Sequence, residues 1–242
     1  MSIEILPVRG IPEVRPGDDL AALLVDGLRA SAIVLRDGDI LAVTQKVVSK
    51  AEGQVVREAD GPGKAGWVER ETRRVVARRG ELVIAETHHG FVCANAGVDA
   101  SNVAEGSLTL LPKDPDESAR RIRASVEAAV GARVAVVVTD TFGRPWREGL
   151  TNVAIGASGL PSIVDLRGHR DADGRVLEAT IVALADEVAA ASGLVMGKSE
   201  GVPAAVLRGL EVPPWAPEAD GRALIRDPKI DLFREGSMDP RV

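Results

Sequence analysis

An aspartate and a threonine, Asp140 and Thr141, follow directly after a short apolar run at residues 133–138. The run is rich in valine and does not alternate with polar residues, which is typical of a strand buried on both faces. An ionised carboxylate at the end of such a strand is costly unless a cation meets it. The pair therefore indicates a divalent metal site that holds phosphate oxygens; the competing interpretation is that Asp140 only caps a turn.

Three further polar segments also follow apolar strands. They are residues 44–53, with Gln45 and two lysines, the turn at 96–103, with Asp99 and Asn102, and the glycine-bounded loop at 197–201. Oxygen ligands suit Mg²⁺ or Mn²⁺, lysines neutralise phosphate charge, and glycines let backbone N–H groups approach oxyanions. Together the segments indicate a site for a nucleoside triphosphate and a metal. The alternative for the turn at 96–103 is that its acid and amide only bond their own backbone.

Three familiar motifs almost match and fail at a required position. Residues 197–199 resemble the end of a phosphate-binding P-loop, but the glycine before them stands one residue too close and a helix is expected where a strand belongs. Residues 169–171 resemble a kinase catalytic loop, but Val176 stands where the metal-binding asparagine is needed. Residues 156–159 lack the last glycine of a nucleophile elbow. These three chemistries are therefore excluded.

The composition narrows the choice further. The chain has 242 residues, 45% of them hydrophobic, a net charge of −6, 2% aromatic residues and a single cysteine, Cys93. The acidic balance and the few aromatic rings argue against a nucleic-acid surface. One cysteine excludes an internal disulfide and any multi-cysteine metal site. No apolar run approaches about 18 residues and no secretory signal opens the chain, so we expect a cytoplasmic protein without membrane contact.

Apolar periodicity and turn residues predict the elements that must position these side chains. Strands are expected at 3–6, 40–43, 82–85, 91–94, 133–138, 162–166 and 204–207, with a weaker one at 151–156. Helices are expected at 20–30 (with Asp18 and Asp19 as the cap), 67–78, 116–131 (with Asp116 as the cap) and 177–193. A proline-rich stretch at 212–217 and a short ordered segment at 223–233 form a C-terminal tail, residues 212–242. Strands and helices mix without strict alternation, so we expect an α+β fold with mixed sheets and packed helices, in one unit of residues 1–242.

Five motifs, taken in order, are similar to those of coenzyme F420:L-glutamate ligases. They occupy residues 10–20, 44–53, 96–102, 139–147 and 196–201, and the resemblance spans about residues 3–210. It implies an unusual α+β ligase fold, which two intertwined subdomains could compose, and a homodimer. It also implies GTP as co-substrate, two divalent cations (Mg²⁺ or Mn²⁺) and K⁺ as a further candidate ion. The form expected here stands alone, without the nitroreductase-like domain of some relatives.

The resemblance also implies residue roles. Divalent metals are expected at Asp99, Asp140 and Thr141, and GTP contacts at Ile11, Pro12, Glu13, Val14, Gln45, Lys50 and Asn102. A loop of Met196, Gly197, Lys198, Ser199, Glu200 and Gly201 is expected to close over the nucleotide. The family pattern has an acid or amide near position 198, whereas this chain has a lysine. Either Glu200 takes that role, or the second metal loses one protein ligand.

The reaction implied by the resemblance is the GTP-dependent addition of L-glutamate to F420-0, a deazaflavin precursor that ends in a phospholactyl carboxylate. An acyl phosphate is the expected intermediate, and the products are F420-1 and then γ-linked F420-2 or longer forms. Arg144 and Arg147 are candidate catalytic clamps for the substrate's phosphodiester or the glutamate carboxylates, since guanidinium pairs with such groups bidentately; alternatively they are surface arginines. Two other functions stay open: a non-catalytic nucleotide- or deazaflavin-binding module, and a metal-dependent phosphohydrolase.

Overall fold

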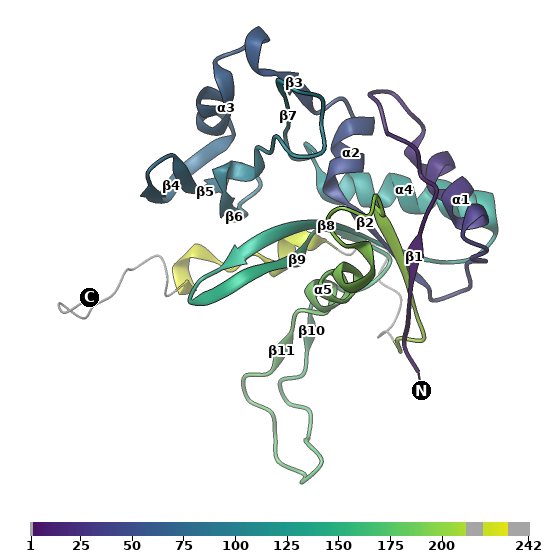
Figure 1. The fold of residues 1–242 in the computed structure, drawn as a ribbon. Helices are drawn as coiled ribbons and strands as arrows, with labels where there is room; N and C mark the ends of the chain where they lie inside the picture. Colours follow the sequence, from purple (N-terminus) through teal and green to yellow (C-terminus); the bar gives the residue numbers. More distant parts are fainter. Residues whose placement is uncertain (1, 212–219, 232–242) are drawn as a thin grey trace, which may run out of the picture.

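The computed structural model describes residues 2–211 and 220–231 of the chain. Several sheets are combined with packed helices, which confirms the α+β class (Figure 1). The predicted proline-rich stretch at 212–217 and the last two residues of the segment 223–233 lie outside the described residues. Inside them, the C-terminal part forms two short 3₁₀ helices, η3 (Gly221–Leu224) and η4 (Pro228–Ile230).

A five-stranded sheet forms the centre of the fold. Its order is β1 (Glu4–Val8), β12 (Ala204–Arg208), β2 (Ile40–Thr44), β8 (Ala135–Arg144) and β9 (Arg147–Ser158). Within it, β2 and β8 pair in parallel and the other neighbours are antiparallel. The strand predicted at 3–6 ends before Pro7, but β1 continues through Pro7 to Val8. This is possible because β1 is an edge strand, where a missing N–H is tolerated.

Helices cover both faces of this sheet. Leu41 and Val43 of β2 pack in one cluster with α1 (Leu20–Ala30) and α4 (Pro115–Val130), whereas Ile40 and Ala42 pack with α5 (Leu184–Met196) on the other face. This alternation is the two-residue period of a strand. Helix α1 begins as predicted, because the Asp19 side chain accepts a hydrogen bond from the backbone N–H of Ala22 at 3.1 Å.

The chain segment that connects α2 (Gln45–Ala51) to α4 forms a smaller unit. Its elements are β3 (Val55–Arg57), η1 (Glu58–Asp60), α3 (Gly63–Glu71), β4 (Thr72–Arg79), β5 (Leu82–Thr87), β6 (Val92–Ala94), η2 (Asn95–Gly97) and β7 (Ser107–Thr109). They have their own apolar cluster, which includes Val68, Ala85 and Leu108. Figure 1 shows this unit on one side of the β8–β9 hairpin, and an arm carrying β10 (Val164–Asp165) and β11 (Ile181–Val182) that projects away from the body.

Two predicted helices have different bounds in the structure. The helix expected at 67–78 begins earlier, at Gly63, and ends at Glu71, and residues 72–79 instead form β4. Gly80 has a φ of +59°, so the chain turns there and β4 pairs back onto β5. The helix expected at 177–193 begins only at Leu184, because Ile181 and Val182 pair with β10.

Three other local predictions also need correction. The cap of α4 is Asp114, which accepts the N–H of Glu117 at 3.0 Å; Asp116 is a buried residue inside the helix. The strand predicted at 133–138 continues to Arg144 because β9 pairs along its whole length, so the polar pair at 140–141 lies within β8 and not beyond its end. Residues 45–51, for which no helix was predicted, form α2.

Candidate functional site

Parallel pairing of β2 and β8 brings Gln45 next to Asp140. Thr44 is in register with Thr139, so the residue that follows each of them lies at the same edge of the sheet. Gln45 opens α2 with its side chain buried, and the Ser49 hydroxyl donates to Gln45 Oε1 at 2.8 Å. This bond fixes the carboxamide, whose hydrogen bond to Asp140 partly opposes the rise in pKa that burial causes at that carboxyl group.

Lys46, the next residue of α2, binds Asp99 across the site. Its Nζ lies 2.7 Å from Asp99 Oδ2, and Ser101 donates to Asp99 from its backbone N–H and its hydroxyl, both at 2.8 Å. Backbone bonds between Asp99 and Thr109 hold the turn in place. Burial acts to raise the pKa of Asp99, but the bonds from Lys46 and Ser101 outweigh it and keep the pKa below its ordinary value. Asp99 is therefore an anion as well as an Asx-turn residue.

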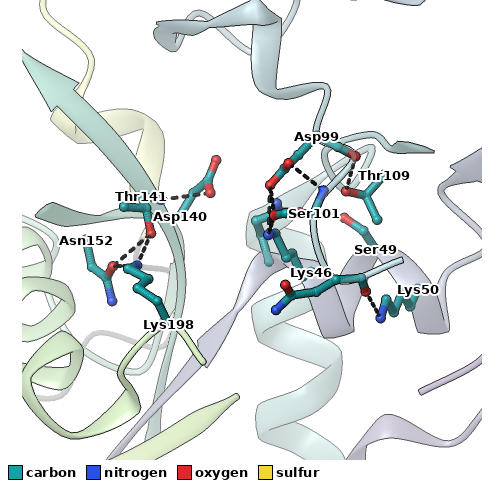
Figure 2. Close-up of polar contacts among 12 residues, drawn as sticks. Lys46, Ser49, Lys50, Asp99, Ser101, Thr109, Asp140, Thr141, Asn152 and Lys198 are labelled. Atoms are coloured by element: carbon teal, nitrogen blue, oxygen red, sulfur yellow. Dashed lines mark hydrogen bonds and ion pairs between the residues drawn. The ribbon is translucent and has the colours of Figure 1, made fainter. Parts of the chain in front are cut away.

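Asp140 lies in a different environment. Burial first, and then the charge of Asp99, raise the pKa of its carboxyl group to about 6, against the opposing effects of the Thr141 N–H at 2.7 Å and of Lys46. The two carboxylates are thus close enough for their charges to interact, and both attract the same ammonium group. Figure 2 shows Asp99 and Lys46 facing Asp140 and Thr141 from opposite sides.

These oxygens fit a cation that is shared with a ligand. No group of three or more His, Cys, Asp or Glu side chains that could hold a metal occurs in residues 2–211 and 220–231. Magnesium is commonly bound through one or two carboxylates, with substrate phosphates and water completing its shell. Asp99 and Asp140 match that pattern, and they do not match an all-protein metal cage.

Lys50 connects three segments that the sequence analysis named separately. Its Nζ lies 2.6 Å from Glu13 Oε1 and 2.6 Å from the backbone oxygen of Asn102, so α2, the loop at 10–14 and the turn at 96–103 meet at one ammonium group. Of the other residues predicted in the loop, Val14 is buried and Ile11 packs against the same core, so both side chains hold the loop in place, whereas Pro12 is exposed.

The loop at 196–201 approaches from the end of α5, where Met196 is buried. The Glu200 carboxylate accepts the backbone N–H groups of Lys198 and Ser199, each at 2.9 Å. These bonds, that of Ser199 first, lower the pKa of Glu200. Gly197 and Gly201, at the two ends of this turn, have positive φ angles of 61° and 66°. Glu200 thus serves to close its own loop.

Lys198 extends from this loop to β8 and β9. Its Nζ donates hydrogen bonds to Thr141 Oγ1 at 2.6 Å and to Asn152 Oδ1 at 3.1 Å. Burial lowers the pKa of its ammonium group. Neither Asn152 nor Lys46 was predicted from the sequence as a site residue. Pairing of Asn152 with Thr141 is a matter of β8–β9 register, for which the sequence carries no signal. Lys46 was visible only as one of two lysines after a buried strand.

Arg144 and Arg147 lie apart from these residues. Both are exposed at the tip of the β8–β9 hairpin, where Arg144 donates to the backbone oxygen of Glu148 at 3.2 Å. Arg144 stands four positions after Asp140 along β8, a span of about 13 Å. The structure does not bring the two arginines together with Asp99 and Asp140, and their role as clamps stays a prediction.

Cys93 lies near Asp140 but is unsuited to nucleophilic chemistry. Burial, followed by the charge of Asp140, raises the pKa of its thiol to about 12. A thiol with such a pKa stays protonated at neutral pH, and the thiolate is the nucleophilic form. Covalent catalysis by this cysteine is therefore excluded.

Comparison with known proteins supports an enzymatic site. The model of the family described as F420-0:Gamma-glutamyl ligase matches residues 10–209. The chain is 42% identical to the coenzyme F420:L-glutamate ligase of Methanothermobacter thermautotrophicus, over 97% of this chain and 100% of that protein. It is 44% identical to the protein of that name from Methanopyrus kandleri, over 96% and 98%, and 38% identical to that from Archaeoglobus fulgidus, over 97% of each.

Among the helices of residues 2–211 and 220–231, none combines the length and the apolar character that crossing a bilayer requires.

Proposed function

Because the chain belongs to the F420-0:gamma-glutamyl ligase family and is a ligase, we propose that it couples GTP hydrolysis to the joining of L-glutamate to F420-0. The first product is F420-1, and further γ-linked additions give F420-2 or longer forms. The observation that carries the proposal is the convergence of Asp99 and Asp140 with the ammonium groups of Lys46 and Lys50 at one edge of the central sheet.

The reaction requires activation of a carboxylate, because an amine cannot displace an oxide ion from it. A lactyl carboxylate oxygen of F420-0 attacks the γ-phosphorus of GTP, the bond to the β-phosphate oxygen breaks, and GDP leaves. The acyl phosphate is then attacked by the α-amino group of glutamate. An amide bond forms, the acyl carbon–oxygen bond breaks, inorganic phosphate leaves and the amine loses a proton.

The residues of the site divide this work. Asp99 and Asp140, with the hydroxyl of Thr141, would hold divalent cations, Mg²⁺ or Mn²⁺, which supply positive charge to the phosphoryl oxygens. Lys50 is suited to a phosphate because its side chain is 9% exposed and its partner Glu13 is 71% exposed. A phosphate oxygen can replace Glu13 at this ammonium, and Glu13 can move into water at little cost.

The remaining parts of the proposal come from the family resemblance. Gln45 and Asn102 contact GTP, the loop at 196–201 closes over it, and Arg144 and Arg147 bind the carboxylates of glutamate or the phosphodiester of F420-0. The chain acts as a cytoplasmic homodimer, and K⁺ is a further candidate ion. A homodimer would be relevant to the exposed arginines, since a second chain can complete a site that one chain leaves open.

A single incubation tests the proposed function. The protein is mixed with GTP, Mn²⁺, F420-0 and L-glutamate, and the products are identified by mass spectrometry. We expect F420-1, GDP and phosphate, each dependent on glutamate. Phosphate release that does not depend on glutamate would instead indicate a phosphohydrolase, and nucleotide binding without turnover would indicate a binding module.

A further inference from the structure

The ammonium group of Lys198 lies among oxygen atoms of the kind that bind metal ions. Thr141 Oγ1 and Asn152 Oδ1 accept its hydrogen bonds at 2.6 and 3.1 Å, and the threonine hydroxyl itself donates to the asparagine oxygen at 2.9 Å. The negative charge of Asp140 also acts on this ammonium. Figure 2 shows Lys198 directed at Thr141 and Asn152, on the side of the site opposite Lys46.

The main chain around Lys198 is held at both ends. Helix α5 ends at Met196, which is 3% exposed, and the chain returns to the core at Val202, which is 5% exposed. Between them, the Glu200 carboxylate accepts the N–H groups of residues 198 and 199. Because the backbone is already anchored, ordering the ammonium costs only the rotamer entropy of the side chain and no further ordering of the loop.

The oxygen atoms that receive this ammonium are also fixed. Asn152 is 7% exposed and stands in register with Thr141. Its amide packs against Gly193 of α5, where an added Cβ would lie 3.1 Å from Asn152 Nδ2. The amide is thus held from behind by the helix, and its oxygen faces Lys198 and Thr141.

We propose that the Lys198 ammonium is a built-in cation that takes the place of the second metal ion beside Thr141. The inference rests on the proposed function, because it concerns the charge around the triphosphate of that site. An ammonium carries three N–H donors. Two of them meet Thr141 and Asn152, and among the described contacts the third is left for an oxygen of the nucleotide.

This arrangement divides the positive charge of the site between two sources. One divalent cation is held at the carboxylates of Asp99 and Asp140, and Lys198 supplies a fixed single charge at Thr141. The enzyme therefore binds one divalent cation per chain with its nucleotide, where two were expected from the resemblance. Replacing Lys198 by a residue whose shorter side chain ends in a neutral oxygen is expected to restore binding of the second divalent cation.

Counting bound Mn²⁺ tests this inference. Mn²⁺ is titrated into the wild type, Lys198→Gln and the control Lys64→Gln, each with an equimolar β,γ-imido analogue of GTP, and free Mn²⁺ is measured by electron paramagnetic resonance. Lys64 is an exposed lysine of α3. We expect one Mn²⁺ per chain in the wild type and the control, and two in Lys198→Gln. Two ions in the wild type, or an unchanged count in Lys198→Gln, would overturn the inference.

A second variant keeps the test independent of how Lys198→Gln folds. In Lys198→Ala the ammonium is lost, so ammonium chloride should raise the melting temperature of this variant and leave that of the wild type unchanged, with choline chloride as the salt control. Ligation by Lys198→Ala should fall roughly 10- to 100-fold and recover in part with ammonium, the range for hydrogen bonds to charged groups. No specific effect of ammonium on Lys198→Ala contradicts the inference.

The two proposals fail separately. The Mn²⁺ count and the melting temperatures need no F420-0 and no glutamate, so they stand even where no amide is formed. Amide formation by the wild type together with two bound Mn²⁺ ions would retain the proposed function and reject the built-in cation.

Discussion

Replacing Asp116 by asparagine is expected to stabilise the protein above pH 6 and to remove a pH dependence of the wild type. Asp116 is 3% exposed within α4, and its Oδ1 accepts two backbone N–H groups, from Ala157 at 2.9 Å and from Gly221 at 2.7 Å. Burial, followed by a hydrogen bond to the carboxylate of Asp220, raises the pKa of Asp116 to about 6. The folded protein thus holds a proton on Asp116 more strongly than the unfolded chain does.

The direction of the effect follows from proton linkage. The pKa of Asp116 is near the ordinary aspartate value of 3.8 in the unfolded chain and about 6 in the folded one. Between these values the folded state binds more protons, so the free energy of unfolding falls as the pH rises from about 4 to about 6 and stays lower above that. A pKa change of about two units corresponds to about 3 kcal/mol. Asp220, whose pKa is lowered in the folded protein, offsets part of this, which leaves about 1–3 kcal/mol.

Asparagine reproduces the protonated state. Its Oδ1 can accept both N–H groups, and its Nδ2 can donate to Asp220. Urea unfolding of the wild type and Asp116→Asn at pH 4.5, 6 and 7.5 measures the effect; at about pH 7.5 the variant should gain about 1–3 kcal/mol, or about 2–4 °C in melting temperature per kcal/mol. Asp116→Ala is the control, because it leaves both N–H groups without their acceptor and should destabilise at every pH. A less stable Asp116→Asn at pH 7.5, or a wild type with no loss of stability between pH 4.5 and 6, would refute the reasoning.

Three further predictions concern the site and the core. Lys50→Met should lower kcat/KM for GTP roughly 10- to 100-fold and cost about 1 kcal/mol of stability, since its partner Glu13 is exposed but the backbone oxygen of Asn102 loses its bond to the ammonium; steady-state kinetics and thermal melting check both, and an equal loss in Glu13→Gln would contradict the assignment to phosphate. Removal of divalent cations by EDTA should abolish ligation, and Mn²⁺ or Mg²⁺ should restore it; full activity in EDTA would exclude the metal role of Asp99 and Asp140. Asp39→Asn should cost about 3–5 kcal/mol in urea unfolding, because it removes the ion pair and turns an N–H₂ group toward one of the two Arg208 donors, which now lie 2.9 and 2.6 Å from a carboxylate that is 2% exposed. A change below about 1 kcal/mol would show that the pair behaves as a surface ion pair.

The elements best predicted from sequence were those whose own residues determine them. The leucines of α1 repeat at helical spacing after the Asp19 cap, and the valines of β8 form an unbroken apolar run, so both were located before the structure was known. The segment at 72–79 was misassigned because its strand state depends on pairing with β5, which the local pattern of arginines and valines does not encode. The first residues of α5 were misassigned for the same reason, since Ile181 and Val182 take part in the arm.

The candidate site was predictable as a set of segments but not as a set of contacts. Asp140 was predicted because a carboxylate after a buried strand requires a partner, the role of Asp99 was implied by the family resemblance, and the structure brings the two charges together. The bonds from Lys198 to Thr141 and Asn152 depend on the register of β8 with β9 and on the position of α5 against them. Such relations join residues up to 57 positions apart, and no local rule of sequence specifies them.

The central claim is that the carboxylate of F420-0 is activated by phosphoryl transfer at the site of Asp99 and Asp140. The most direct measurement uses F420-0 labelled with ¹⁸O in its lactyl carboxylate, together with GTP, Mn²⁺ and L-glutamate, and follows the label by mass spectrometry. We predict that one ¹⁸O atom from each activated carboxylate appears in the released inorganic phosphate and that the other stays in the amide carbonyl. Phosphate without ¹⁸O, released while the labelled carboxylate keeps both of its oxygen atoms, would contradict the account.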